Sequence, residues 1–363
     1  MVVCFHLGGY TMAKSTAIRF ANPLDNALAH LLATGHYGVQ LFFIISGFVL
    51  ALPFARHHLT HAPAPRLGAY YRRRLTRLEP PYIIAMTLIF AAATMFFGAS
   101  ARSLWPHLLA SLAYVHNLVY GVGSAVNIVA WSLEVEVQFY LLAPLLAFVF
   151  AISGTWTRRI AIVTGISMAI LVQHFGVADN PRLSLTLLNQ LQFFLLGFLI
   201  ADLYITEWTT PSTHTLLWDV AGVLAWVALA TVLTLVRRPA VLFPLLACVV
   251  FCATFRGSAM RRLLSNRWLT TIGGMCYTIY LLHYPLISAL GRRTIRMGGG
   301  ASFTEHFLLQ FTIIVPLLLL VSTLYFVLVE RPCMNKDWPR DLVEWSRSVT
   351  WRTMPDRLSS LWR

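Results

Sequence analysis

Long apolar runs separated by short polar segments recur along the whole chain. Roughly nine of these runs have about 17 to 25 residues each, the length that an α-helix needs to cross the hydrocarbon core of a bilayer. They extend approximately over residues 36–54, 80–98, 135–152, 160–175, 185–204, 216–236, 240–255, 268–290 and 307–329. Backbone amides in lipid must be satisfied within the protein, so the runs predict an all-α fold, a polytopic transmembrane bundle of about nine to ten spans.

The composition agrees with this pattern and excludes an ordinary soluble domain. The chain is 58% hydrophobic and only 12% charged, with a mean hydropathy of +0.67. No connection between the runs is long and polar enough to hold a second fold. We therefore predict one membrane domain over residues 1–332 and a basic tail over residues 333–363. The tryptophans and arginines of this tail are typical of a segment that lies on the membrane surface.

Basic residues predict the orientation of the bundle. The net charge is +14. If the runs alternate and the initial apolar fragment counts as a span, the cytoplasmic segments carry about 19 of the 28 Lys and Arg residues, as the positive-inside rule requires. Both chain ends are then cytoplasmic. We therefore expect the chain to contact membrane lipid and not to bind nucleic acid.

Two carboxylates, Glu134 and Glu136, lie within an apolar run, where a charged side chain costs about 2.5 to 3.5 kcal/mol. Residues two apart on a helix point about 200° apart, so the two carboxylates cannot share one proton. Glu136 lies on the same face as Tyr140 and Ser132, and Glu134 on the same face as Gln138. At most one of the two carboxylates is therefore expected at a reaction centre.

Histidines in the apolar segments are candidate general bases, because a neutral imidazole can take a proton near neutral pH. His6 lies in the initial apolar fragment and His283 in the stretch YTIYLLHYPLI, although a structural role is the commoner one for such a residue. No carboxylate or cysteine lies near the cluster of histidines at residues 57–61, so we expect no metal site.

The basic stretch YYRRRLTRLEPPY offers a different kind of candidate. On a helix, Arg73 and Arg74 would share a face with Arg77 and present guanidinium groups to phosphate in a bidentate manner. An ordinary cluster of charge that sets the membrane topology explains the same pattern. On composition alone both interpretations remain open.

Five motifs, taken together, resemble the acyltransferase 3 family. They are GVQLFFIISGFVL at residues 38–50, the Arg-x-x-Arg-x-x-Pro-x-Tyr run at 74–82, WSLEVEVQFYLLAP at 131–144, YTIYLLHYPL at 277–286 and VERP at 329–332. The resemblance implies an enzyme of the bacterial inner membrane that transfers an acyl group, most often acetyl, from cytoplasmic acyl-CoA. The implied acceptor is a hydroxyl of an envelope carbohydrate or a lipid-linked glycan, and no metal is required.

The resemblance also implies roles for individual residues. His6 matches the family's histidine in the first helix and would act as general base, while Arg74 and Arg77, with Arg73 beside them, would hold the phosphates of CoA. Glu136 matches the family's glutamate and would orient a polar partner. The basic residue that usually precedes the histidine would fall before Met1, so we expect the first helix to be truncated in this sequence.

Three other interpretations compete with this one. Ser46 could be a nucleophile, but no nucleophile elbow surrounds it and its neighbours indicate close helix packing. A transporter or flippase for a glycan or an anionic solute would use the intramembrane carboxylates for ion coupling, but we find no inverted repeat. The third is an assembly subunit that retains the fold without activity.

Overall fold

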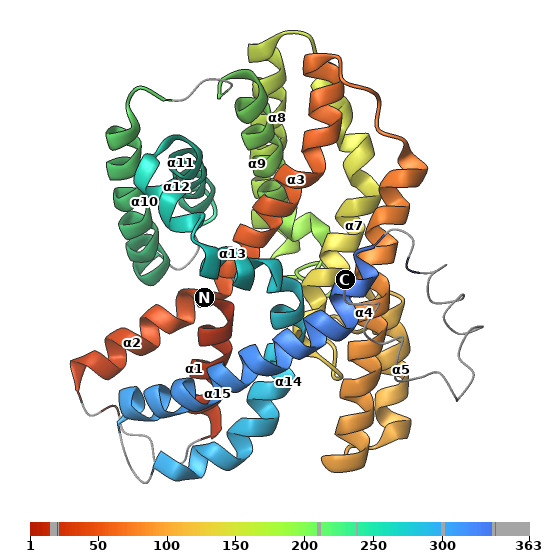
Figure 1. Cartoon of the computed structure of the whole chain (residues 1–363), viewed down its shortest axis with the longest axis vertical. Helices are drawn as coiled ribbons and strands as arrows, with labels where there is room; N and C mark the ends of the chain where they lie inside the picture. Colours follow the sequence, from red (N-terminus) through yellow and green to blue (C-terminus); the bar gives the residue numbers. More distant parts are fainter. Residues whose placement is uncertain are drawn as a thin grey trace, which may run out of the picture.

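The computed structural model describes the chain except residues 15–19, 21, 209–211, 237–238, 299–301, 336–337 and 339–363. Every element in the described part is a helix, which confirms the predicted all-α fold (Figure 1). The longer helices are α1 (Val2–Lys14), α2 (Pro23–Ala33), α3 (Gly38–Thr60), α4 (Leu67–Phe96), α5 (Ala101–Leu112), α7 (Trp131–Leu146), α8 (Thr155–Val172), α9 (Leu187–Thr206), α10 (Thr215–Leu235), α11 (Leu242–Arg256), α14 (Cys276–Thr294) and α15 (Phe303–Tyr325). Shorter elements are η1 (Thr34–Tyr37), α6 (His116–Tyr120), η2 (Ile128–Ala130), η3 (Ala147–Ala151), η4 (Gln173–Val177), α12 (Ser258–Leu264), α13 (Arg267–Gly274), η5 (Ile295–Gly298), η6 (Phe326–Glu330) and α16 (Arg331–Cys333).

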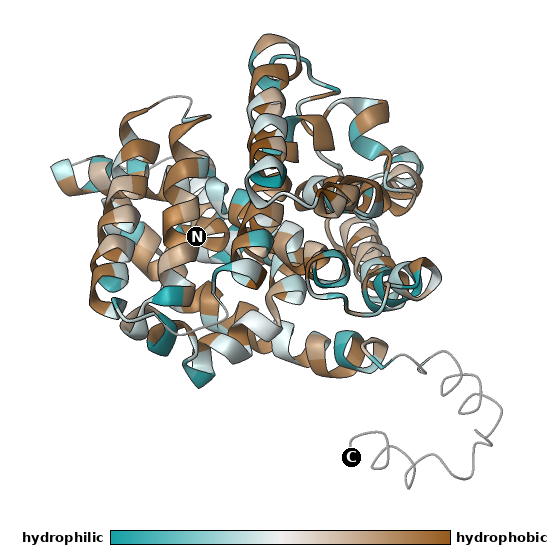
Figure 2. Cartoon of the chain, turned by 90° about the horizontal axis from the view of Figure 1, so that it is seen from above, coloured by the Kyte–Doolittle hydropathy of each residue, from teal (hydrophilic) through white to brown (hydrophobic). Residues whose placement is uncertain are grey.

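Seven helical segments of the described residues are long and apolar enough to cross a membrane, so the chain is a multi-pass membrane protein. They are Pro23–Thr60, Leu67–Phe96, Ile128–Ala151, Thr155–Val177, Leu187–Thr206, Thr215–Leu235 and Phe303–Cys333. The pair α11 and α12, bent by 89°, would make an eighth. Hydrophobic residues predominate along these helices (Figure 2), and many large ones, such as Leu88, Leu141 and Leu320, are exposed, as contact with lipid requires.

Two predicted runs have different bounds in the structure. α4 begins at Leu67, well before the predicted start at residue 80, because its arginine-rich half continues the same helix. The run predicted over residues 268–290 is two helices, α13 and α14, which meet at Met275. α14 has 19 residues, but its tyrosines, histidine and arginines make it less apolar than the seven segments above.

The crossing of α3 and α9 forms the centre of the bundle. Gly47 of α3 and Gly197 of α9 lie where the backbones meet, and a Cβ on Gly47 would overlap the carbonyl oxygen of Phe194. Beside this crossing the Phe194 ring stacks on Phe43 and Phe139, with centroids 4.8 and 4.0 Å away. Small residues allow this close approach, and the stacked rings fill the space around it.

Two prolines interrupt the backbone ladder of α4. Pro80 has no N–H to donate to the carbonyl of Thr76, and the indole Nε1 of Trp338 donates to that carbonyl instead, at 3.2 Å. Tyr325 donates to the carbonyl of Pro81 at 2.5 Å. Trp338, which we predicted on the membrane surface, thus contacts α4. The rest of the predicted tail beyond it, and with it the predicted domain boundary, stays a prediction, because residues 339–363 lie outside the described residues.

A buried ion cluster joins α8 to α9. Arg158 donates through Nε to one carboxylate oxygen of Asp202 at 2.5 Å, and Arg159 donates to the other at 2.8 Å. Arg158 also donates to the carbonyl of Ile152, and Arg159 to Glu207, at 2.9 and 2.8 Å. Arg158 and Asp202 are 2% and 0% exposed, so each charge is buried directly against its partner.

Candidate active site

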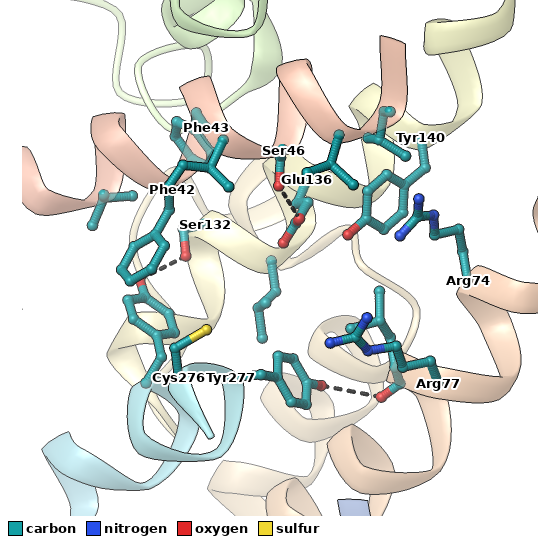
Figure 3. Close-up of a pocket in the computed structure, with 17 residues that line it drawn as sticks. Phe42, Phe43, Ser46, Arg74, Arg77, Ser132, Glu136, Tyr140, Cys276 and Tyr277 are labelled. Atoms are coloured by element: carbon teal, nitrogen blue, oxygen red, sulfur yellow. Dashed lines mark hydrogen bonds between the residues drawn. The ribbon is translucent and has the colours of Figure 1, made fainter. Parts of the chain in front are cut away.

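A pocket of about 230 Å³ lies between α3, α4, α7 and α14 (Figure 3). Its α3 wall is mostly apolar, and charged and polar groups come from α4, α7 and α14. The lining residues are Val39, Phe42, Phe43, Ile45, Ser46, Val49, Leu50, Arg74, Arg77, Leu78, Ser132, Leu133, Glu136, Tyr140, Cys276, Tyr277 and Tyr280. Four of the five sequence motifs contribute to it. The pocket is therefore the place where segments far apart in the sequence meet.

Arg74 and Arg77 reach the pocket from the same side of α4, because they are three residues apart on one helix. The guanidinium of Arg74 lies 5.9 Å from the ring centre of Tyr70 and 5.7 Å from that of Tyr140. Among the described residues, neither Arg74 nor Arg77 has a carboxylate within salt-bridge distance. Arg73 is exposed and does not line the pocket.

Glu136 extends into the pocket from α7, as Figure 3 shows. The hydroxyl of Ser46 on α3 donates to its Oε1 at 2.5 Å. This bond joins two helices and fixes the carboxylate at the pocket wall. It also gives Ser46 a partner that accounts for its position without a role as nucleophile.

Glu134 has a different environment, although it is only two residues away. It is fully buried, and its Oε2 accepts a hydrogen bond at 2.9 Å from the backbone N–H of Asn117, in the first turn of α6. Gln138, on the same face, accepts from the backbone N–H of Leu187 at 2.9 Å. Glu134 does not line the pocket. The two carboxylates thus have different surroundings, and Glu134 satisfies a backbone N–H in the first turn of α6.

His6 lies in α1, outside the pocket lining. Its ring centre is 5.1 Å from that of His283 and 5.1 Å from that of Tyr284, both in α14. Tyr280 borders the pocket and packs on His283 with centroids 5.5 Å apart. The structure therefore brings Arg74, Arg77 and Glu136 together but leaves His6 outside the pocket lining, against α14.

Several polar residues of the motifs have roles that sequence reasoning missed. Ser132 donates to the hydroxyl of Tyr280 at 2.6 Å, and the Tyr277 hydroxyl donates to the carbonyl of Leu78 at 3.0 Å. Glu330 of the VERP motif is buried and accepts from Thr278 at 2.5 Å. The two tyrosines of YTIY, three residues apart and so on one face of a helix, were the sequence signal that could have predicted these bonds. These bonds hold α14 against α7, α4 and η6.

In the part of the chain that the structure describes, no group of three or more His, Cys, Asp or Glu side chains is placed to hold a metal ion. The ring of His57 bonds instead to the carbonyl oxygen of Ala62 at 2.8 Å. The charged side chains that line the pocket are Arg74, Arg77 and Glu136.

Comparison with known proteins adds a family and a set of relatives. The acyltransferase 3 family model, described as an acyltransferase domain, matches residues 1–327. O-acetyltransferase OatA from Staphylococcus aureus strains NCTC 8325 / PS 47, COL and MRSA252 is 26% identical over 292 residues. The match covers 71% of this chain and 47% of each relative, so the chain spans about half the length of the curated relatives it matches. No solved structure matches.

Proposed function

Because the chain belongs to the acyltransferase 3 family, we propose that its pocket binds acetyl-CoA or a related acyl-CoA and that the acyl group passes to a hydroxyl of a carbohydrate or lipid-linked glycan. The family and the O-acetyltransferase relatives support an enzyme of O-acyl transfer. The observation that carries the proposal is the pair Arg74 and Arg77. Two guanidinium groups beside a pocket, with no carboxylate within salt-bridge distance in the described part of the chain, favour an anionic ligand.

The size of the pocket suggests which part of the donor enters it. At about 230 Å³ it is smaller than the roughly 300–1,000 Å³ of a typical small-molecule site, and a whole CoA molecule would not fit. The thioester end of the pantetheine arm is narrow and largely apolar, and it suits the α3 wall. The phosphates would then stay at the mouth, where Arg77 is exposed and Arg74 is half-buried.

We propose that His6 is the general base. It takes the proton of the acceptor hydroxyl while the oxygen attacks the thioester carbonyl. The C–S bond then breaks, and the CoA thiolate leaves and recovers the proton from His6. Because His6 does not line the pocket, the thioester would have to extend beyond the lining residues to reach it. Glu136 would orient polar groups of the donor or of α3, and exclusion of water would suppress hydrolysis of the thioester.

The orientation of the protein follows from the same assignment. CoA is cytoplasmic, so the end of α4 that carries the arginines would face the cytoplasm of a bacterial cell, in the inner membrane. The positive-inside rule favours the same side for this arginine cluster, and it places the C-terminus there as well. The acceptor glycan would approach from the other leaflet.

Protection of a native thiol tests the donor site. Cys276 lines the pocket with Arg74 and Arg77, so bound acetyl-CoA should shield it from a maleimide. Purified protein is labelled with and without acetyl-CoA, and mass spectrometry locates the label, with Cys276→Ser as the control. We expect protection in the wild type and none in the Arg74→Met/Arg77→Met variant. Unchanged labelling of wild-type Cys276 at saturating acetyl-CoA would contradict the proposal.

Isotope-labelled acetyl-CoA separates the enzyme from its alternatives. With membranes that contain envelope glycans, we expect release of CoA and label in the glycan, and loss of both in His6→Ala without loss of membrane insertion. Uptake of a glycan or an anionic solute by vesicles, without CoA release, would indicate a transporter. Neither activity would indicate an assembly subunit.

A further inference from the structure

His283 is a buried histidine whose hydrogen bonds are only half made. It is fully buried in α14, and its Nδ1 lies 2.6 Å from the carbonyl oxygen of Tyr280. Its Nε2 is buried and has no hydrogen-bond partner among the described residues. Buried polar atoms are nearly always paired, so this atom needs an explanation.

The hydrogen bond to Tyr280 settles which ring nitrogen carries the proton. A carbonyl oxygen can only accept, so Nδ1 of His283 must be the N–H donor. In the neutral ring Nε2 is then a bare acceptor. His6 is the histidine ring from another helix that packs on His283, with centroids 5.1 Å apart and a tilt of 47° between the rings. His6 is therefore placed to supply an N–H to this acceptor.

We infer that His283 is a positioning residue for His6, an inference that rests on the proposed function. The two rings are in contact but not hydrogen-bonded in the structure, so the His6 ring has to turn to bring its N–H to Nε2 of His283. This bond leaves the other nitrogen of His6 unprotonated and directed at the acceptor hydroxyl. When His6 takes the hydroxyl proton, its cation donates to the same Nε2. The proton returns to the CoA thiolate at the end of the step, and His283 itself neither gains nor loses one.

The packing around the two rings suits this role. α1 and α14 pack against each other, and a Cβ on Gly291 of α14 would overlap the ring of Tyr10 of α1. The other titratable groups near the two histidines include the amine of Met1, Tyr280 and Tyr284 of α14, Tyr10 of α1 and His36, which packs on Phe5. None of these is a carboxylate, so a neutral acceptor takes the place that an aspartate has in a hydrolase triad.

Two variants of His283 test the inference. His283→Phe fills the space without an acceptor, and His283→Gln can restore an acceptor oxygen near the position of Nε2. We expect His283→Phe to lower kcat by about 10- to 100-fold, a part of the roughly 10²- to 10⁴-fold that a general base contributes. The KM for acetyl-CoA should stay unchanged, and His283→Gln should recover part of the loss.

The pH profile distinguishes positioning from mere support of the fold. Without the acceptor, His6 holds its proton less firmly, so the acidic limb of the kcat profile should move to lower pH in His283→Phe. The matched control is His306→Phe on α15, because His306 is also buried and also has an unpartnered nitrogen, Nδ1. It should lower stability without moving the profile.

The outcomes separate this inference from the proposed function. The inference is wrong, and the proposed function stands, in two cases in which His6→Ala is inactive. In the first, folded His283→Phe keeps the wild-type kcat. In the second, His283→Phe loses activity without a shift of the pH profile, and His283→Gln recovers none of it. If wild-type protein transfers no acyl group, or His6→Ala remains active, the proposed function itself fails. Melting in detergent identifies variants that do not fold.

Discussion

Arg158 and Arg159 of α8 resemble Arg74 and Arg77 of α4 in composition, since each pair places guanidinium groups within the helix bundle. Their surroundings differ. The α8 pair is fully engaged, with Asp202 and Glu207 as partners at 2.5 to 2.8 Å. The α4 pair has aromatic rings and a pocket beside it and no carboxylate within salt-bridge distance among the described residues.

This difference predicts a structural role for the α8 arginines and ligand binding by the α4 arginines. A buried charge that is already neutralised contributes to the packing of two helices, and a ligand would have to displace its partner to bind. A charge without a partner keeps its attraction for a ligand of opposite sign. Four experiments test this distinction, from the largest expected effect to the smallest.

Replacing Arg158 by Met should have the largest effect, and on stability alone. The substitution leaves one carboxylate oxygen of Asp202 without its buried partner. This loss costs about 3–5 kcal/mol in the free energy of unfolding. Activity per folded molecule should not change. Unfolding in mixed micelles measures the loss, with Arg74→Met as the comparison. An equal loss of stability in Arg74→Met would mean that both arginine pairs are structural.

Replacing both Arg74 and Arg77 by Met should mainly affect donor binding. Each hydrogen bond to a charged group contributes about 1.5–3 kcal/mol, so the KM for acetyl-CoA should rise by about 100-fold or more while that for the acceptor changes little. The matched control is Arg72→Met, an exposed arginine of the same helix. If the donor KM stays at the wild-type value, the α4 arginines only set topology.

The two carboxylates of α7 extend the comparison. Glu134→Ala leaves the backbone N–H of Asn117 without an acceptor and should cost about 1–3 kcal/mol in stability, with activity per folded molecule retained. Glu136→Ala should lower kcat with a smaller loss of stability. Parallel melting and acetyl-transfer assays measure both quantities. The reverse pattern would assign the functional role to Glu134.

Ser46→Ala should have the smallest effect. Its hydroxyl donates one hydrogen bond to Glu136, so we expect less than about a tenfold loss of kcat. A serine that formed a covalent acyl intermediate would lose far more, as removal of a nucleophile does. Single-turnover transfer from labelled acetyl-CoA measures the difference. A loss above a thousandfold in folded protein would restore Ser46 as a nucleophile.

Periodicity and composition predicted the helices and the membrane class, because lipid imposes the same length and apolarity on every span. The spacing of Glu134 and Glu136 also predicted that they face opposite ways. The sequence could not reveal the distance between His6 and the arginines, which depends on how α1 and α14 cross. It could not reveal the partners of Arg158 either, because Asp202 lies 44 positions further along the chain.

The close contact of Gly47 with Gly197 bears on how the site admits its donor. With no side chains between them, the backbones of α3 and α9 cannot slide without a clash, so the α3 wall of the pocket stays fixed. α4, interrupted at Pro80 and Pro81, lacks two backbone donors and bends more easily there. If the proposed donor binds at this pocket, opening and closing around it should therefore be a movement of the arginine-bearing half of α4.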